Sequence, residues 1–220
     1  MNEKPLNFVL IGRSGSGKGT QAELLKERFP NLVHIITGDL FRKLGSMDTD
    51  TSHTIKKILE AGGLPLDDIA TTLWMHEIAF NVKKDQGILA DGFPRRLAEA
   101  KNLDRFLKFL DRKNNTFYLL IDISRQEAFD RLTKRRICNK CGKLIPWVGK
   151  FRKLKVCDRC GGELITRLDD NIKAIKNRLD YFDKNVLPVV KYYEKQKKLI
   201  KINGEQSIED VFKDILKILK

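Results

Sequence analysis

Short apolar runs alternate with longer amphipathic stretches along this chain of 220 residues. Continuous apolar runs predict buried strands, and hydrophobic positions at three- and four-residue steps predict helices. We expect strands at residues 7–11, 32–36, 87–91, 116–122 and 199–202. We expect helices at residues 18–29, 68–84, 96–110, 125–136, 169–193 (with a kink at Pro188) and 207–219. This alternation predicts an α/β fold with a parallel sheet covered on both faces.

Two stretches interrupt the alternation and lack a core strand of their own. Residues 37–67 have a helical pattern, and residues 134–170 contain all four cysteines. Both leave and rejoin the core at the ends of predicted elements. We therefore interpret them as insertions into one α/β domain.

The charge balance is strongly basic, with 43 Lys and Arg against 29 Asp and Glu and a net charge of +14. Such a charge suits either a nucleic-acid-binding surface or a lysine-rich solvated surface. The lysines are scattered along predicted helices, as at residues 56–57, 83–84 and 197–198, and form no block with interleaved aromatic residues. This distribution favours the solvated surface over nucleic-acid binding.

Hydropathy predicts a protein without a membrane span. Apolar runs stay well below the roughly 18 residues that a spanning helix needs. The apolar run at residues 8–11 is too short for a signal peptide and leads straight into a glycine-rich segment. We therefore expect a cytoplasmic protein.

That glycine-rich segment, Gly12 to Thr20, has the G-x-x-x-x-G-K pattern of a phosphate-binding loop. It lies between a predicted strand and a predicted helix, which favours this interpretation over a plain glycine turn. Backbone N–H groups and the helix N-terminus attract phosphates, and Lys18 reaches the terminal ones. The segment predicts binding of a nucleoside triphosphate or a closely similar molecule.

The four cysteines form two C-x-x-C pairs separated by fifteen residues, Cys138 with Cys141 and Cys157 with Cys160. Glycines follow each pair and permit tight turns. The spacing predicts a structural zinc ribbon. Two disulfides are the alternative, and a reducing compartment disfavours them. Four thiolates leave no open coordination position, so the metal is expected to be structural.

Three further motifs follow the phosphate-binding loop in a characteristic order. They are Thr37-Gly38-Asp39 with Arg42, Asp91-Gly92-Phe93-Pro94-Arg95, and Arg167-x-Asp169-Asp170 with Arg178. Together with Gly19, Thr20 and Gln21 after Lys18, they resemble the adenylate kinase family in its long form with a zinc-bearing lid. The resemblance covers essentially the whole chain.

The resemblance implies a three-layer P-loop fold with a five-stranded parallel sheet, a helical insertion that binds a nucleoside monophosphate (NMP) and a zinc-ribbon lid. The implied core comprises residues 1–35, 66–133 and 171–220, the NMP-binding flap 36–65 and the lid 134–170. The implied enzyme is a monomeric phosphotransferase that uses Mg²⁺ and converts ATP and AMP reversibly into two ADP.

The resemblance also assigns site residues. It implies ATP binding by Gly15, Ser16, Gly17, Lys18, Gly19, Thr20, Arg131, Arg135, Leu144, Ile145 and Gln206. It implies AMP binding by Thr37, Arg42, Gly63, Leu64, Pro65, Gly92, Phe93, Pro94, Arg95, Glu99, Arg167 and Arg178. The implied catalytic residues are Lys18, Asp91, Arg95, Arg135, Arg167 and Arg178. Asp91 would orient magnesium, and Asp169 and Asp170 would hold lid arginines. For all three, a turn or a helix N-cap is the alternative role, and both roles are compatible.

Residue choice supports these assignments. Lysine outnumbers arginine almost two to one, yet Lys18 apart, every cationic position matched to the family is arginine. A planar guanidinium grips phosphate with two hydrogen bonds, whereas a solvated surface has no such preference.

The chain departs from the family pattern at three places. Arg13 and Ser14 stand where small residues and proline are usual, and residues 144–151 lack the usual Tyr-His pair and Phe-Asn-Pro-Pro run. Glu99 stands where a glutamine reads adenine. A carboxylate only accepts hydrogen bonds, so Glu99 would suit the N–H donors of guanine or cytosine better than adenine. The other alternative is that Glu99 faces solvent and contacts no base. Thr37 is the adenylate-type residue, so AMP stays the predicted acceptor, with a GMP or CMP kinase as the alternative.

A second class of function is a zinc-ribbon nucleic-acid-binding protein with a regulatory ATPase loop, and a third is an inactive scaffold. Basic residues around the cysteines motivate the former. The nucleic-acid-binding class has no role for the Asp-Gly-Phe-Pro-Arg motif and the matched arginines, and the intact Lys18 and arginines argue against an inactive scaffold.

Overall fold

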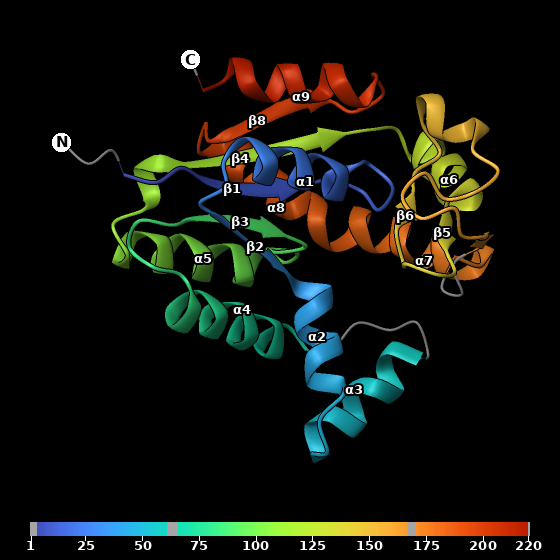
Figure 1. Cartoon of the computed structure of the whole chain (residues 1–220). Coiled ribbons are helices and arrows are strands. Elements are labelled where there is room, and N and C mark those ends of the chain that lie inside the picture. The colour runs from blue at the N-terminus through green and yellow to red at the C-terminus, as the bar shows by residue number, and fades with distance from the viewer. Residues whose placement is uncertain (1–3, 61–65, 167–169, 220) are drawn as a thin grey trace. The chain divides into compact units, whose positions relative to one another are not determined.

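The computed structural model describes residues 4–60, 66–166 and 170–219 (Figure 1). Contacts divide the chain into two compact units. The first comprises Met1–Ile11, Ala22–Leu120 and Asn185–Ile200, and the second Gly12–Gln21, Ile121–Lys184 and Lys201–Lys220. No helix in the described ranges is long and apolar enough to cross a membrane.

A five-stranded parallel sheet forms the centre of the fold, in the order β2-β3-β1-β4-β8. Its strands are β1 (Asn7–Ile11), β2 (Leu32–Ile36), β3 (Gly87–Asp91), β4 (Thr116–Asp122) and β8 (Leu199–Asn203). The predicted α/β class and strand count are thereby confirmed. In register, Leu10 of β1 and Ile36 of β2 both pair with Asp91, so the end of β3 lies between the ends of its two neighbours.

Burial explains why the strands are apolar throughout. Every residue of β1 is buried, because both faces of a central parallel strand are covered. The one polar residue, Asn7, accepts a hydrogen bond from the backbone N–H of Ile88 through Oδ1, at 3.0 Å. Its amide donates to the carbonyls of Pro5 and Asn115, so its polar atoms are paired.

The helices follow the expected order. They are α1 (Lys18–Arg28), α2 (Thr37–Gly45), α3 (Asp50–Glu60), α4 (Asp67–Asn81), α5 (Leu97–Phe109), α6 (Arg125–Lys134), α7 (Ile172–Tyr181), α8 (Leu187–Lys195) and α9 (Ile208–Lys217). Short 3₁₀ turns cover Lys113–Asn115 and Gly149–Lys153. Ser207 caps the last helix, because its Oγ accepts from the backbone N–H of Asp210 at 3.1 Å.

Three predicted helices are wrong in extent. The helix expected over residues 68–84 ends at Asn81, because Val82 has an extended backbone. The helix expected over residues 169–193 is divided into α7, a π-helical turn at Phe182–Val186 and α8. The division precedes Pro188, which lies in the first turn of α8, where its missing N–H costs nothing. The helix expected over residues 125–136 ends at Lys134, because Arg136 already belongs to a strand.

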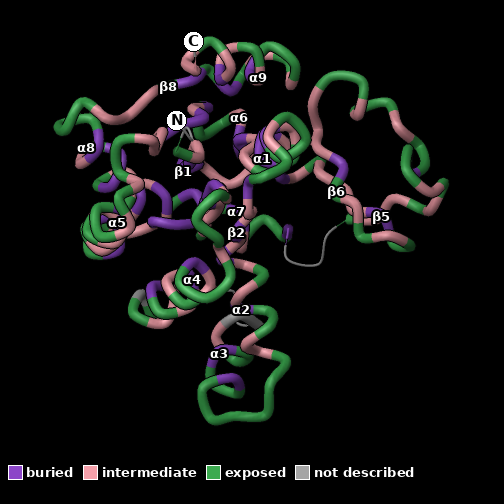
Figure 2. The backbone as a smooth tube through the Cα atoms, turned by 60° about the vertical axis from the view of Figure 1, so that its left-hand side comes forward, coloured by how far each residue is buried: buried purple, intermediate pink, exposed green. Residues whose placement is uncertain are grey.

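The two insertions have different architectures. The first consists of α2 and α3, and Figure 2 shows α3 exposed over most of its length, with Ser52 and Ile55 buried. The second contains a small antiparallel sheet in the order β6-β5-β7. Its strands are β5 (Arg136–Cys138), β6 (Leu144–Ile145) and β7 (Leu164–Thr166). The domain boundaries assigned from the sequence stay a prediction.

Candidate functional site

The glycine-rich loop joins β1 to α1 and packs against α6. Gly15 has φ +83°, and a Cβ there would lie 3.0 Å from Leu132 Cγ and 3.2 Å from the carbonyl oxygen of Ala128. Any larger residue would force the loop away from α6. The backbone N–H of Ser16, a residue only 2% exposed, donates to the carbonyl of Arg13 at 3.1 Å and closes the turn.

Lys18 begins α1, and its ammonium group stays close to the loop. Nζ donates to the carbonyls of Gly12 at 2.8 Å and Arg13 at 2.9 Å. Gly19 and Thr20 follow in the first turn of the helix, whose N-terminal N–H groups carry a partial positive charge. Backbone amides, a helix N-terminus and a lysine therefore converge as phosphate binding requires.

A buried guanidinium lies beside the segment between β8 and α9. Arg131, only 6% exposed, donates from Nε to Glu127 Oε1 at 2.6 Å and from Nη2 to the Gly204 carbonyl at 3.0 Å. Two hydrogen bonds fix the plane of this side chain. In the same segment, Gln206 donates to the Asn203 carbonyl and to Asp214 Oδ2.

One buried carboxylate orients two arginines. Asp170, whose side chain is 0% exposed, accepts from Arg135 Nε at 2.8 Å and Arg135 Nη2 at 2.6 Å. Its Oδ1 also accepts from Arg178 Nη1 at 2.8 Å. The prediction that Asp170 holds arginines is confirmed, and the alternative of a helix cap is wrong for it, because Asn171 Oδ1 caps α7 at 2.8 Å.

Two residues assigned to ATP binding lie in a strand of the second insertion, and several other assigned residues lie outside the described ranges. Leu144 and Ile145 form β6, which pairs with Ile137 and Arg136 of β5. Leu144 is 37% exposed and Ile145 is buried. Arg167, Asp169, Gly63, Leu64 and Pro65 lie outside the described residues, so their assignments stay predictions.

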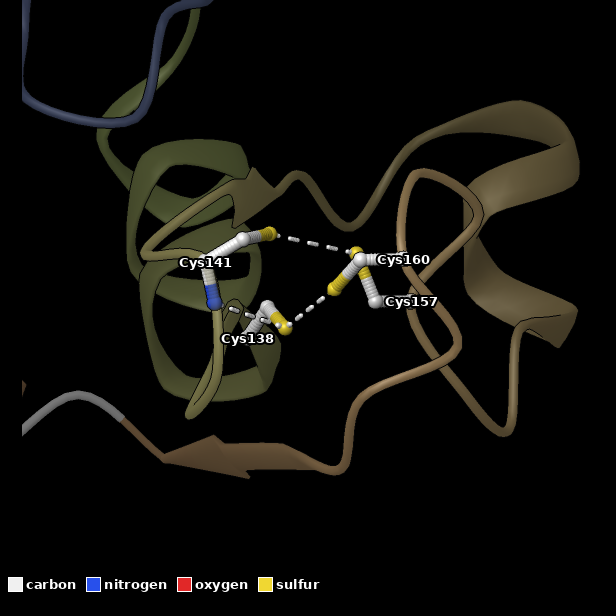
Figure 3. A group of neighbouring side chains, drawn as sticks. All are labelled: Cys138, Cys141, Cys157 and Cys160. Carbon is white, nitrogen blue, oxygen red and sulfur yellow. Dashed lines mark hydrogen bonds between the residues drawn. The ribbon is translucent and has the colours of Figure 1, made fainter.

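The four cysteines converge within the second insertion (Figure 3). All their Sγ atoms lie within 4.8 Å of one another. Sγ of Cys138 is 3.5 Å from that of Cys160, and Sγ of Cys141 is 3.7 Å from that of Cys157. These separations are close to the ~3.8 Å between sulfurs around a tetrahedral Zn²⁺ with ~2.3 Å bonds. They are far longer than the roughly 2.05 Å of a disulfide, so the disulfide alternative does not fit.

Backbone geometry prepares the cysteines to bind a cation. Gly142 and Gly161 both have φ +68°, which gives each C-x-x-C pair the same tight turn. The Cys141 backbone N–H donates to Cys138 Sγ and lowers the pKa of the Cys138 thiol, whereas the pKa of the Cys160 thiol is raised because hydrogen bonds with its neighbouring thiols outweigh the lowering by the Gly162 backbone. A thiolate is the form that ligates metal.

The first residues of α2 lie beside the end of β3. Thr37, which is 3% exposed, donates from Oγ1 to the Asp91 carbonyl at 3.4 Å. Arg42 forms an ion pair with Asp39 one helical turn away, and both side chains are more than half exposed. An exposed pair of this kind contributes little to stability.

The Asp-Gly-Phe-Pro-Arg segment leads from β3 towards α5. Arg95 Nε donates to the Gly92 carbonyl at 2.6 Å, which folds the side chain back over the segment. The peptide bond between Phe93 and Pro94 is cis. Phe93 is 1% exposed and stacks on Trp74 of α4, with ring centroids 5.1 Å apart.

Glu99, the residue that departs from the family pattern, is 3% exposed and does not face solvent. Its Oε1 accepts from the indole N–H of Trp74 at 3.0 Å, and its Oε2 accepts from the Arg95 backbone N–H at 2.5 Å. Sequence reasoning missed Trp74, since nothing in the local pattern relates it to a residue 25 positions later.

A second unpredicted neighbour lies beside Asp91. The His34 side chain of β2 is 6% exposed, and its Nε2 is 3.6 Å from Asp91 Oδ2. The pairing of Ile36 with Asp91 brings the two strands together here. Only the strand order, which the sequence does not state, reveals this proximity.

A phosphate-binding loop after the first strand of a parallel α/β sheet places the protein in the class of P-loop nucleotide-binding proteins. The family model described as adenylate kinase matches residues 10–198. The chain is 34% identical over 216 residues to an adenylate kinase of Thermosipho africanus, covering 98% of this chain and 100% of that protein. Identity is 39% to one of Geobacillus sp. strain WCH70, covering 97% and 98%, and 37% to one of Clostridium acetobutylicum, covering 97% and 99%. The chain belongs to the adenylate kinase family, and it is a phosphotransferase.

Proposed function

We propose that the chain transfers the γ-phosphoryl group of ATP to AMP, reversibly, and that the residues described above divide this work. The full-length similarity to adenylate kinases carries the proposal. The loop at residues 12–20, Arg131 and Gln206 hold ATP, and Thr37, Arg42, Arg95 and Glu99 hold AMP.

In the proposed reaction, an oxygen of the AMP phosphate attacks the γ-phosphorus of ATP. The bond from that phosphorus to the β–γ bridging oxygen breaks, and both products are ADP. Charge spreads over the transferred group, so catalysis consists of positioning and neutralisation by fixed cations. Lys18, Arg95, Arg135, Arg178 and Arg167 supply those cations. Asp170 keeps Arg135 and Arg178 oriented before the nucleotide arrives.

Magnesium fits the donor chemistry at the end of β3. Asp91 offers carboxylate oxygen, the ligand type this hard cation prefers, and would hold the ion through its water shell. When bound with ATP, magnesium neutralises phosphate charge. The His34 ring at 3.6 Å limits the positions that the Asp91 carboxylate adopts.

A coupled assay of ADP formation tests the proposal. ATP and magnesium are supplied with AMP, GMP, CMP or UMP at equal concentrations. We expect the highest kcat/KM with AMP. Turnover with GMP or CMP alone would replace the AMP assignment, and turnover with none would contradict the proposed reaction.

Zinc is the proposed metal of the cysteine cluster, as the sulfur separations support. A structural metal supplies folding free energy to an insertion too small for its own core. We expect one zinc per chain after purification without added metal. We expect Cys157→Ala to lower Tm by about 5 °C or more, while kcat at low temperature changes by less than about threefold. Metal analysis, thermal melting and the coupled assay measure these quantities.

Arg159→Ala is the matched control for this experiment, since Arg159 is an exposed neighbour in the same turn and no ligand. It should retain zinc and the wild-type Tm. An unchanged Tm for Cys157→Ala, or a wild-type protein without metal, would contradict the zinc assignment.

Acceptor choice is expected to depend on Glu99. A carboxylate faces the N1 lone pair of adenine unfavourably, whereas a glutamine amide donates an N–H to it. The same substitution removes one of the acceptor oxygens that would bind the N–H groups of guanine. We expect Glu99→Gln to raise the ratio of kcat/KM for AMP over GMP by about tenfold. Steady-state kinetics of both proteins with both monophosphates measures the ratio. Glu194→Gln, at an exposed position of α8, is the control, and an unchanged ratio in Glu99→Gln would show that Glu99 does not contact the base.

A further inference from the structure

Arg13, the second residue of the phosphate-binding loop, directs its side chain away from the loop to the segment after α7. Nη1 donates to Asp183 Oδ1 at 2.6 Å. The guanidinium carbon lies 4.4 Å from the centroid of the Phe182 ring, a cation–π distance. The Arg13 side chain is 16% exposed and that of Asp183 is 39% exposed, so the guanidinium is mostly covered while the carboxylate stays partly open to solvent.

Asp183 is held from its other side as well. Its Oδ2 accepts from Arg125 Nη1 at 2.6 Å, and Arg125 also pairs with Asp180. Burial raises the pKa of Asp183, but the hydrogen bonds from Arg13 and Arg125 outweigh it and lower the pKa below its ordinary value. The carboxylate is therefore ionised at neutral pH, and the Arg13–Asp183 ion pair persists there.

The π-helical turn at Phe182–Val186 makes this arrangement possible. Phe182 and Asp183 are consecutive residues, yet both contact the same guanidinium. π-helical turns of this kind are frequent at functional sites. The contact joins residues that are 170 positions apart in the chain.

The main chain of Arg13 belongs to the loop's own hydrogen-bond network. Its carbonyl accepts from Lys18 Nζ at 2.9 Å and from the Ser16 backbone N–H at 3.1 Å. Fixing the Arg13 side chain therefore fixes the carbonyl on which Lys18 and the turn depend. A loop already in its binding conformation binds its ligand without the cost of ordering.

We propose that Arg13 is a positioning residue for ATP: its ion pair with Asp183 holds the phosphate-binding loop in the conformation that receives the triphosphate. The inference rests on the proposed role of residues 12–20 in holding ATP. Because the guanidinium is engaged by Asp183 and Phe182, Arg13 acts through the loop backbone and Lys18 instead of contacting the nucleotide.

Calorimetric titration of ATP into Arg13→Ala and Asp183→Ala tests the proposal. We expect both variants to bind ATP about tenfold more weakly, with the double variant no weaker than either single one. The two substitutions change net charge in opposite directions. A direct contact between Arg13 and ATP, or a purely electrostatic effect, predicts that Asp183→Ala binds ATP as well as the wild type or more tightly, and this result would overturn the proposal.

Arg125→Ala is the matched control. This substitution removes a positive charge that pairs with Asp183, as Arg13→Ala does, but Arg125 is not part of the phosphate-binding loop. We expect its Kd for ATP to stay within about twofold of the wild type, while Arg13→Lys, which keeps a cation for Asp183, recovers part of the affinity. An Arg125→Ala loss equal to that of Arg13→Ala would overturn the proposal.

Steady-state kinetics separates positioning from general destabilisation. The KM for ATP should rise in Arg13→Ala, while the KM for AMP and the melting temperature stay near the wild-type values. A parallel rise in both KM values would overturn the proposal. The titration measures ATP binding without a nucleoside monophosphate, so it separates two kinds of failure. If the wild type does not bind ATP, the proposed function is contradicted. If the wild type and the variants bind ATP equally, only the proposed role of Arg13 is contradicted.

Discussion

Replacing Lys18 with methionine is expected to lower kcat about a hundredfold while leaving the fold intact. Methionine has a similar length and helix propensity, so α1 keeps its first turn. What is lost is a preorganised cation at the transferred phosphoryl group, worth about 3 kcal/mol or more in the barrier. The coupled assay measures kcat, and circular dichroism checks folding.

Lys26→Met is the control for this variant. Lys26 lies in the same helix, is exposed and carries the same charge. Its substitution should leave kcat near the wild-type value. A Lys18→Met enzyme of near-normal turnover would remove Lys18 from the proposed machinery.

The second large effect is expected at Asp170. Alanine there removes the buried carboxylate and leaves Arg135 and Arg178 without the acceptor they share. Removing one partner of a buried charge cluster costs about 3 kcal/mol of folding free energy. With both guanidinium groups misoriented, we expect kcat to fall by about tenfold or more as well.

Denaturant unfolding and the coupled assay measure the two consequences of Asp170→Ala separately. Asp180→Ala in α7 is the matched control, because it removes an exposed carboxylate that pairs with Arg125. The control should lose less than about 1 kcal/mol. Asp170→Ala with unchanged kcat would mean that the orientation of these arginines does not limit turnover.

The sheet was predictable because buried parallel strands appear as continuous apolar runs. β1 is buried at every position and its bounds match the prediction. Helix interiors were predictable because their hydrophobic residues recur at three- and four-residue steps, but the ends of the helices were not. Nothing in the hydrophobic spacing indicates that residues 182–186 form a π-helical turn.

The candidate site also contains residues that could be predicted from the sequence and neighbours that could not. The resemblance to the adenylate kinase family predicted that Asp170 holds arginines, and the spacing of the two C-x-x-C pairs predicted that the four cysteines converge. Trp74 beside Glu99 and His34 beside Asp91 follow no pattern. Such pairs arise from helix packing and strand order, which are properties of the whole fold.

The cysteine cluster has a consequence for how this chain diverges from its relatives. In the second insertion, sulfur ligands within 4.8 Å of one another replace the interlocking apolar side chains that ordinarily restrict substitution. Between the two cysteine pairs, Ile145 is buried in β6, whereas Leu144, Gly149 and Lys150 are exposed. If the proposed metal holds the two turns together, substitutions at these exposed positions leave the insertion folded, so its outer surface is free to differ from the family pattern without loss of the fold.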